Sequence, residues 1–197
     1  MTTTSFVGTD PARHPRSHAL LVDMASEFPD FALVYKRTSR LQRAIHLTLA
    51  LLTFGGQRVY MTKYYTVLFG KLWLPDAWDV LSDVDRVILL RHERVHLRQR
   101  RRMGDVVMGF VYLVPFFPLF LAYGRARIEW EAYEETIRAT YELKGDAAAE
   151  GLRSFLIGRF VGGEYGFMWP FPKVVGEWFD RFLGDLRRSG PGAGSSL

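Results

Sequence analysis

The chain has 197 residues, of which 48% are hydrophobic and 24% are charged, so it can bury a core, and disorder throughout is excluded. Because it contains no cysteine, disulfides and thiolate metal sites are also excluded, and a metal ion could be held only by imidazole and carboxylate groups. The net charge of +5 permits contact with nucleic acid or anionic lipid without specifying either.

The two ends of the chain are predicted to be flexible. The first twenty residues are polar and broken by proline, and they lack the apolar core of a signal peptide. The last residues, RRSGPGAGSSL, are too rich in glycine and other small residues to bury a surface. We therefore expect a flexible arm over residues 1–18, a flexible tail over residues 188–197 and a cytoplasmic protein.

The segments that follow the arm predict a helix and then short strands. The segment SRLQRAIHLTLALLTFGG opens with Ser39 as an N-cap, is apolar as far as Leu52 and ends at Gly55-Gly56, as a buried helix does. The next segment, RVYMTKYYTVLFGKLWLP, is rich in β-branched and aromatic residues and is punctuated by glycine and proline. It predicts two or three short strands.

The segment SDVDRVILLRHERVHLRQRRR predicts a strongly marked helix. Ser82 can cap its N-terminus, where Asp83 and Asp85 suit the positive end of the helix dipole, and the arginines suit the other end. Because His92 and His96 are four positions apart, they lie one turn apart on one face of the helix. Both imidazoles can therefore bind one metal ion.

The same segment supports two functions. Glu93 lies beside the histidines, where its carboxylate can hold a water molecule for hydrolysis. The arginines could instead bind an anionic surface, with the histidine pair accidental or structural. Helical spacing places four of these arginines on a face away from the histidines, so the two interpretations are compatible: Arg91, Arg94, Arg98 and Arg101.

The apolar run from Val106 to Tyr123 contains no charged residue. It barely reaches the length of a membrane span, and Pro115 and Pro118 would break a spanning helix. A full span would also separate His96 from the next helix by a hydrocarbon layer about 30 Å thick. We therefore expect a buried helical hairpin bent at Pro-Phe-Phe-Pro. The alternative is peripheral or re-entrant contact with a membrane.

A third metal ligand is predicted on the helix RARIEWEAYEETIRATYE. Its helical period places Glu129 on an inward stripe of small residues that includes Ala126 and Ala132. Glu129 is therefore the expected third ligand, and Glu131 is the alternative. The other acidic residues of this helix are expected on its charged outer face, paired with arginines: Glu131, Glu134 and Glu135.

His92-Glu93-x-x-His96, followed by Glu129 and Ala132 in a Glu-x-x-Ala pattern, resembles the motifs of the gluzincin metallopeptidases, the thermolysin-like group. The resemblance covers roughly residues 57–140. It implies a zinc ion (Zn2+) held by the two histidines and the later glutamate, and a zinc-bound water that Glu93 activates to hydrolyse a peptide bond.

The resemblance also has implications for the sheet and for the surroundings of the metal. It implies that the last strand, at KLWLP, is an edge of the sheet above the zinc helix, where a peptide can add as a further strand. The family commonly has an acidic or amide residue four positions after the ligating glutamate, whereas this chain has Tyr133. The oxyanion of the reaction needs a stabilising group, for which Tyr133, Tyr165 and an arginine are the candidates.

The predicted fold class is α+β and predominantly helical, with a small β-sheet packed on the zinc-binding HExxH helix and a downstream glutamate helix. We expect a zincin-like metallohydrolase domain over residues 19–145 and a C-terminal helical extension over 146–187 packed on it. The extension should end in an amphipathic helix with one apolar side, made of Val174, Val175, Trp178, Phe179 and Phe182.

The predicted function is that of a zinc-dependent hydrolase, a metallopeptidase that acts on a peptide or protein substrate. The alternative is a basic protein that binds nucleic acid or an anionic membrane, in which His92, Glu93 and His96 are not catalytic. Nucleic acid is the less favoured partner. Membrane association would involve the run from Val106 to Tyr123.

Overall fold

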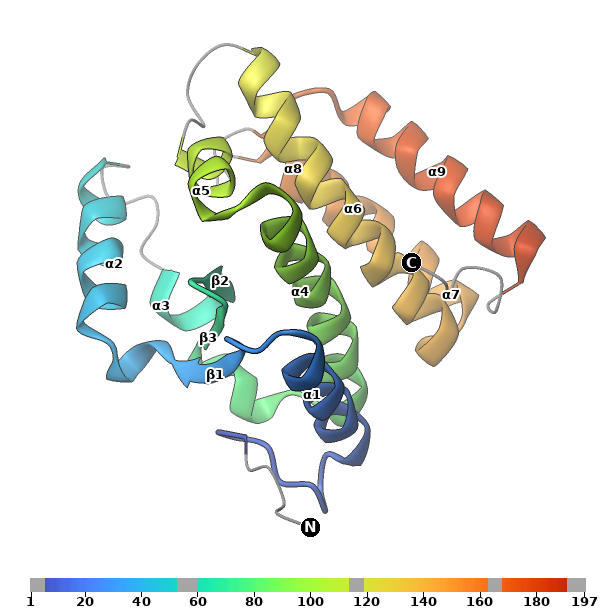
Figure 1. Cartoon of the computed structure of the whole chain (residues 1–197). Helices are drawn as coiled ribbons and strands as arrows, with labels where there is room; N and C mark the ends of the chain where they lie inside the picture. The colour runs from blue at the N-terminus through green and yellow to red at the C-terminus, as the bar shows by residue number, and fades with distance from the viewer. Residues whose placement is uncertain (1–5, 53–59, 114–118, 163–167, 191–197) are drawn as a thin grey trace. The chain divides into compact units, whose positions relative to one another are not determined.

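A computed structural model describes residues 6–52, 60–113, 119–162 and 168–190. In these residues the chain is predominantly helical with one small sheet (Figure 1), which confirms the predicted α+β class. The contacts within the chain divide it into two compact units, Met1–Leu97 and Arg98–Leu197. This division falls inside helix α4 (Asp83–Met103), whereas the sequence placed the domain boundary at residue 145.

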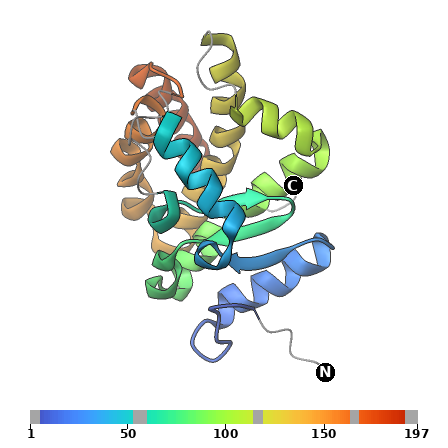
Figure 2. The same cartoon turned by 90° about the vertical axis from the view of Figure 1, so that its left-hand side faces the viewer.

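The sheet of the first unit has three strands in the order β1-β3-β2 (Figure 2). Strand β1 (Ala32–Tyr35) runs parallel to β3 (Lys71–Leu74), and β2 (Thr66–Leu68) pairs with β3 in antiparallel fashion. The turn between β2 and β3 consists of Phe69 and Gly70, both at positive φ, as a tight hairpin requires. The prediction that KLWLP forms an edge strand is wrong, because β1, which the sequence analysis missed, covers its other side.

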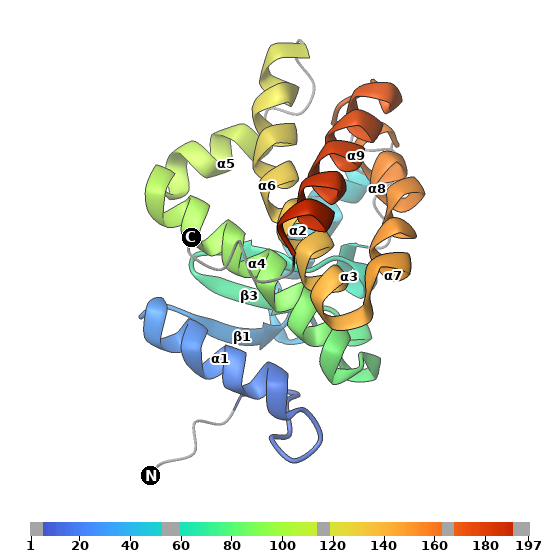
Figure 3. The same ribbon diagram turned by 90° about the vertical axis from the view of Figure 1, so that its right-hand side faces the viewer.

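Helix α1 (Pro15–Glu27) packs along the sheet (Figure 3). The cluster it joins contains residues of β1, β3 and α4, which are buried together: Leu21, Met24, Leu33, Leu72, Leu74, Leu90 and Leu97. Helix α1 begins within the segment predicted to be a flexible arm, and Phe6 is also buried in this cluster. The sequence gives no periodic signal there, because the segment is fixed by tertiary contacts.

One of these contacts is an N-terminal cap supplied from a distant part of the chain. Asp83 accepts hydrogen bonds from the backbone N–H groups of Arg16 and Ser17, at 3.0 and 2.9 Å, and from the Ser17 hydroxyl at 2.7 Å. These are orphan donors of the first turn of α1. Burial raises the pKa of Asp83, but the hydrogen bonds outweigh burial and hold that pKa below its usual value.

The remaining short elements of the first unit are η1 (Lys36–Thr38), α2 (Arg40–Leu52), α3 (Tyr60–Lys63) and η2 (Asp76–Val80). The predicted cap of α2 is confirmed, because the Ser39 hydroxyl accepts a hydrogen bond from the backbone N–H of Gln42 at 3.2 Å. The predicted cap of α4 is also confirmed, because Ser82 accepts one from Asp85 at 3.1 Å. The predicted stop of α2 at Gly55-Gly56 lies outside the described residues.

The second unit contains α5 (Asp105–Leu113), α6 (Leu119–Lys144), α7 (Asp146–Glu150), α8 (Leu152–Val161) and α9 (Pro172–Ser189). Figure 1 shows α6, α8 and α9 side by side, and their apolar faces form one cluster. The predicted amphipathic character of α9 is confirmed by its buried Val175 and Phe179. The predicted extension therefore shares its core with the glutamate helix α6.

The apolar run from Val106 to Tyr123 includes α5 and the start of α6, and its predicted bend at Pro-Phe-Phe-Pro lies outside the described residues. Val106 and Val107 are 86% and 50% exposed, so the expected burial does not extend to the start of α5, although Met108 is buried. None of the helices in the described segments is long and apolar enough to cross a membrane.

Candidate metal centre

Helix α4 brings the two histidines of the motif together. The Nε2 atoms of His92 and His96 are 3.2 Å apart, and their rings stand edge to face with centroids 4.9 Å apart. His96 is buried, and His92 is partly buried. This is the arrangement that the spacing of four residues predicts for one face of a helix.

The separation of the two nitrogens can be compared with what zinc requires. Two imidazole nitrogens bound to zinc at about 2.0–2.1 Å, at a tetrahedral angle, are about 3.3 Å apart. The 3.2 Å between the Nε2 atoms of His92 and His96 is close to this value. The spacing of the pair is therefore compatible with zinc.

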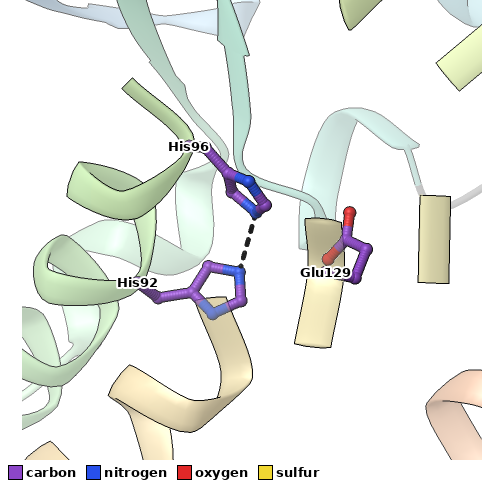
Figure 4. A group of neighbouring side chains, drawn as sticks. All are labelled: His92, His96 and Glu129. Carbon is purple, nitrogen blue, oxygen red and sulfur yellow. Dashed lines mark hydrogen bonds between the residues drawn. The ribbon is translucent and has the colours of Figure 1, made fainter. Parts of the chain in front are cut away.

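Glu129 of α6 is the third member of the group. Its side chain is 6% exposed, and candidate ligand atoms of His92, His96 and Glu129 all lie within 4.8 Å of one another (Figure 4). The ligand atoms of a closed tetrahedral zinc site are about 3.3 Å apart, a separation that lies within this limit. The predicted ligand set is thus the set that the described residues bring together.

A hydrogen-bonded glutamine holds the C-terminal end of α4 against α6. The Gln99 amide donates to the backbone oxygen of Ile128 at 2.9 Å and to Oε2 of Glu131 at 2.8 Å. These acceptors lie on either side of Glu129 in the sequence, and Gln99 is only three residues after His96. The sequence analysis missed Gln99, although its position one turn beyond His96 is a signal for this role.

The three other carboxylates predicted on the outer face of α6 have partners on their own helix or in Gln99. Glu131 is exposed, and Glu135 pairs with Arg138 at 2.6 Å. Glu134 accepts a hydrogen bond from the Trp130 indole at 2.5 Å, and burial raises its pKa. Within the described residues, Glu131 is not part of the metal-ligand group, which distinguishes it from Glu129.

Glu93 is 6% exposed and lies next to His92 in the sequence of α4. Its negative charge affects the pKa of two other residues of the first unit. Burial lowers the pKa of Lys36 to about 7, an effect that the negative charge of Glu93 opposes. Burial also raises the pKa of Tyr65, and the charge of Glu93 raises it further.

The sequence analysis missed Lys36 and Tyr65. Lys36 follows a strand that was not predicted, and a lysine in a segment such as VYKRTS is ordinarily exposed. Of the candidates for the oxyanion, Tyr133 packs in the cluster of α6, α8 and α9, with its ring centroid 5.7 Å from that of Phe160. Tyr165 lies outside the described residues.

Two arginines of α4 are engaged in ion pairs, Arg94 of the predicted arginine face and Arg100 outside it. Arg94 donates to Oε2 of Glu27 on α1 at 2.6 Å, and Arg100 pairs with Asp105 through two hydrogen bonds. These arginines stabilise α1 and the junction of α4 with α5. They therefore have a structural role within the chain that does not require nucleic acid or an anionic membrane.

No protein-family model, curated protein or solved structure matches this chain. The gluzincin resemblance therefore rests on the motif residues alone. The chemistry of the site is argued from His92, Glu93, His96 and Glu129 themselves.

Proposed function

We propose that this protein is a zinc-dependent hydrolase, a metallopeptidase of the gluzincin type. His92, His96 and Glu129 are its zinc ligands, and Glu93 is its general base. The observation that carries the proposal is the 3.2 Å separation of the two Nε2 atoms, together with the buried carboxylate of Glu129 in the same group. Imidazole and carboxylate are also the only strong ligand types for zinc in a chain without cysteine.

Three protein ligands leave one position of a tetrahedral zinc site open, which is typical of catalytic rather than structural zinc. A zinc ion in this site would polarise a substrate carbonyl and lower the pKa of a water molecule to about 7. Glu93 would accept the proton from the attacking water and transfer it to the leaving amine. Its place between His92 and His96 on α4 suits this role, because it is near the ligands without being one of them.

The sheet supports a peptide as the substrate. Strand β2 lies at one edge of the order β1-β3-β2, and Tyr65, which precedes it, feels the charge of Glu93. An extended peptide can bind by adding to a sheet edge through main-chain hydrogen bonds. We therefore assign the substrate-binding edge to β2, in place of the strand at KLWLP.

Zinc content and hydrolysis, measured on the same preparation, test the proposal. We expect about one zinc per chain in protein purified without added metal, and cleavage of a peptide pool detected by mass spectrometry. Glu93→Gln should keep the zinc but lower kcat by about 10²- to 10⁴-fold, the usual contribution of a general base. Glu131→Gln makes the same chemical change on an exposed carboxylate and should leave kcat unchanged. Equal turnover by zinc-loaded Glu93→Gln and wild type would refute the mechanism.

A further inference from the structure

Lys36 is a fully buried lysine that the proposed mechanism does not use. It begins η1 directly after β1, and its side chain is 0% exposed. Lysine is almost never fully buried without a partner, because its ammonium group loses its hydration. The surroundings of Lys36 must therefore compensate its charge or favour its neutral form.

One contact of Lys36 is a hydrogen bond from Nζ to Oγ1 of Thr66 on β2, at 2.8 Å. A hydroxyl group anchors the ammonium but carries no charge to balance it. In the described part of Met1–Leu97, Glu93 is the buried carboxylate. A buried cation and a buried anion in the same compact unit are expected to pair, because each removes the desolvation cost of the other.

The electrostatics agree with this pairing. The negative charge of Glu93 favours the charged form of Lys36 against the effect of burial. Glu93 also acts on Tyr65, the residue before Thr66, whose buried hydroxyl has no hydrogen-bond partner within the described residues. The charge of Glu93 therefore acts on two buried residues, Lys36 at the end of β1 and Tyr65 just before β2, and Lys36 is bonded to Thr66 of β2.

We propose that Lys36 is a positioning residue for Glu93: its ammonium group, anchored on Thr66, fixes the orientation in which the Glu93 carboxylate accepts a proton from the attacking water. This inference rests on the proposed function for the catalytic role of Glu93. The pairing itself does not depend on zinc, so it can be measured in metal-free protein.

Removing one member of a buried ion pair leaves the other uncompensated, whereas removing both costs much less. We would measure urea-unfolding midpoints of the metal-free full-length protein for wild type, Lys36→Met, Glu93→Gln and the double variant. The midpoint of the double variant should be higher than the sum of the two single shifts predicts. Additive shifts would overturn the proposal.

Arg86 provides a matched control, because it is also a buried cation of the first unit. Its guanidinium donates to the backbone oxygens of Gly8 and Trp78, and the largest effects of carboxylate charge on it come from Asp79 and Asp83. Arg86→Met should therefore be destabilising but additive with Glu93→Gln. Equal coupling for Arg86 and Lys36 would overturn the assignment to Lys36.

Thr66→Val tests the anchor without removing the charge, and it serves if Lys36→Met does not fold. In zinc-loaded protein it should lower kcat by about 10- to 100-fold, the range for residues that orient a ligand or a reacting group, with KM unchanged. Combined with Glu93→Gln it should cause no further loss, whereas a multiplied loss would overturn the proposal. If the shifts in unfolding midpoint are coupled but the protein hydrolyses no peptide, the proposed function is refuted. If the protein hydrolyses peptides but the shifts are additive, only the role of Lys36 is refuted.

Discussion

The two compact units bury different kinds of side chain. In Met1–Leu97 the buried residues include ionisable groups, among them Lys36, Arg86, Glu93 and His96. In Arg98–Leu197 the core is a cluster of apolar and aromatic residues that includes Trp130, Tyr133, Phe160 and Phe179. At the surface of this unit arginines pair with carboxylates, as in Arg153–Asp180 and Arg187–Asp146.

Buried charge costs stability unless it is paired, whereas buried aromatic surface is the main source of stability. The first unit therefore buries ionisable groups that need partners, whereas the core of the second unit is built from apolar and aromatic side chains. Glu129 is the exception to this apolar core, because among the described residues of the second unit it is the buried carboxylate. A buried carboxylate in an otherwise apolar setting is a mark of a functional site.

Loss of a proposed metal ligand should have the largest effect. We expect His92→Ala, His96→Ala and Glu129→Ala each to lower zinc affinity by more than about 100-fold, because changes in residues that only orient ligands already cost about 10- to 100-fold. Competition with a chromogenic chelator measures the affinity. If Glu129 is buried because it binds zinc, Glu129→Ala should lower zinc affinity about as much as His92→Ala or His96→Ala does.

Glu131→Ala is the control for this comparison, since it is on the same helix two residues away. Glu131 is exposed and accepts a hydrogen bond from Gln99. Its replacement should therefore change zinc affinity by less than about 10-fold, the lower end of the effect of residues that only orient ligands. If Glu131→Ala lost zinc while Glu129→Ala kept it, the assignment from the inward helical face would be wrong.

The grouping of the three proposed ligands could be predicted because the signals for it are local. Helical spacing fixes which side chains share a face, so the pairing of His92 and His96 follows from their spacing of four positions, and the inward position of Glu129 follows from the small-residue stripe. Lys36 and Thr66 could not be predicted, because they meet through the pairing of β1 and β2 with β3. Contacts of this kind depend on the sheet order, which no period in the sequence specifies.

The contribution of the aromatic core of the second unit to stability can be measured by removing one of its rings. Phe160 is fully buried, and its ring lies 5.7 Å from Tyr133 and 6.0 Å from Trp130, measured between centroids. Phe160→Ala should lower the free energy of unfolding by about 3–5 kcal/mol, through lost burial and the cavity it leaves. Urea unfolding measures this change. A loss below about 1 kcal/mol would mean that this cluster is not a main source of stability.

The same contrast explains which parts of the fold were predicted. The caps at Ser39 and Ser82 and the amphipathic face of α9 are properties of one segment, and the structure has them. The order of the N-terminal segment was not predicted, because Asp83 caps α1 across more than sixty residues of sequence. A polar, proline-containing segment shows no sign of such a partner.

Asp83 provides a prediction of intermediate size. Asp83→Asn should lower the free energy of unfolding by about 1 kcal/mol at neutral pH, because the amide loses the charge and keeps only one of the two oxygens that accept hydrogen bonds from α1. Because the pKa of Asp83 is lowered in the folded protein, its contribution is present above the usual aspartate pKa and is lost as the pH falls through the lowered folded value.

The difference between Asp83→Asn and wild type should therefore be constant near neutrality and shrink in acid, below the usual pKa of 3.8. Unfolding midpoints measured from pH 7 downward follow this difference. A difference that stayed constant into strong acid would show that the carboxylate charge does not stabilise α1.

The smallest effect is expected for an ion pair at the surface of the second unit. Arg153 donates two hydrogen bonds of 2.8 Å to the Asp180 carboxylate, linking α8 to α9, and both side chains are about half exposed. Water and salt screen such a pair, so Arg153→Ala should lower the free energy of unfolding by only about 0.2–1 kcal/mol, and less at high salt. A salt titration of the unfolding midpoint measures this. If Arg153→Ala were as costly as Phe160→Ala, the second unit would depend on its charges as the first does, and the contrast between the two units would fail.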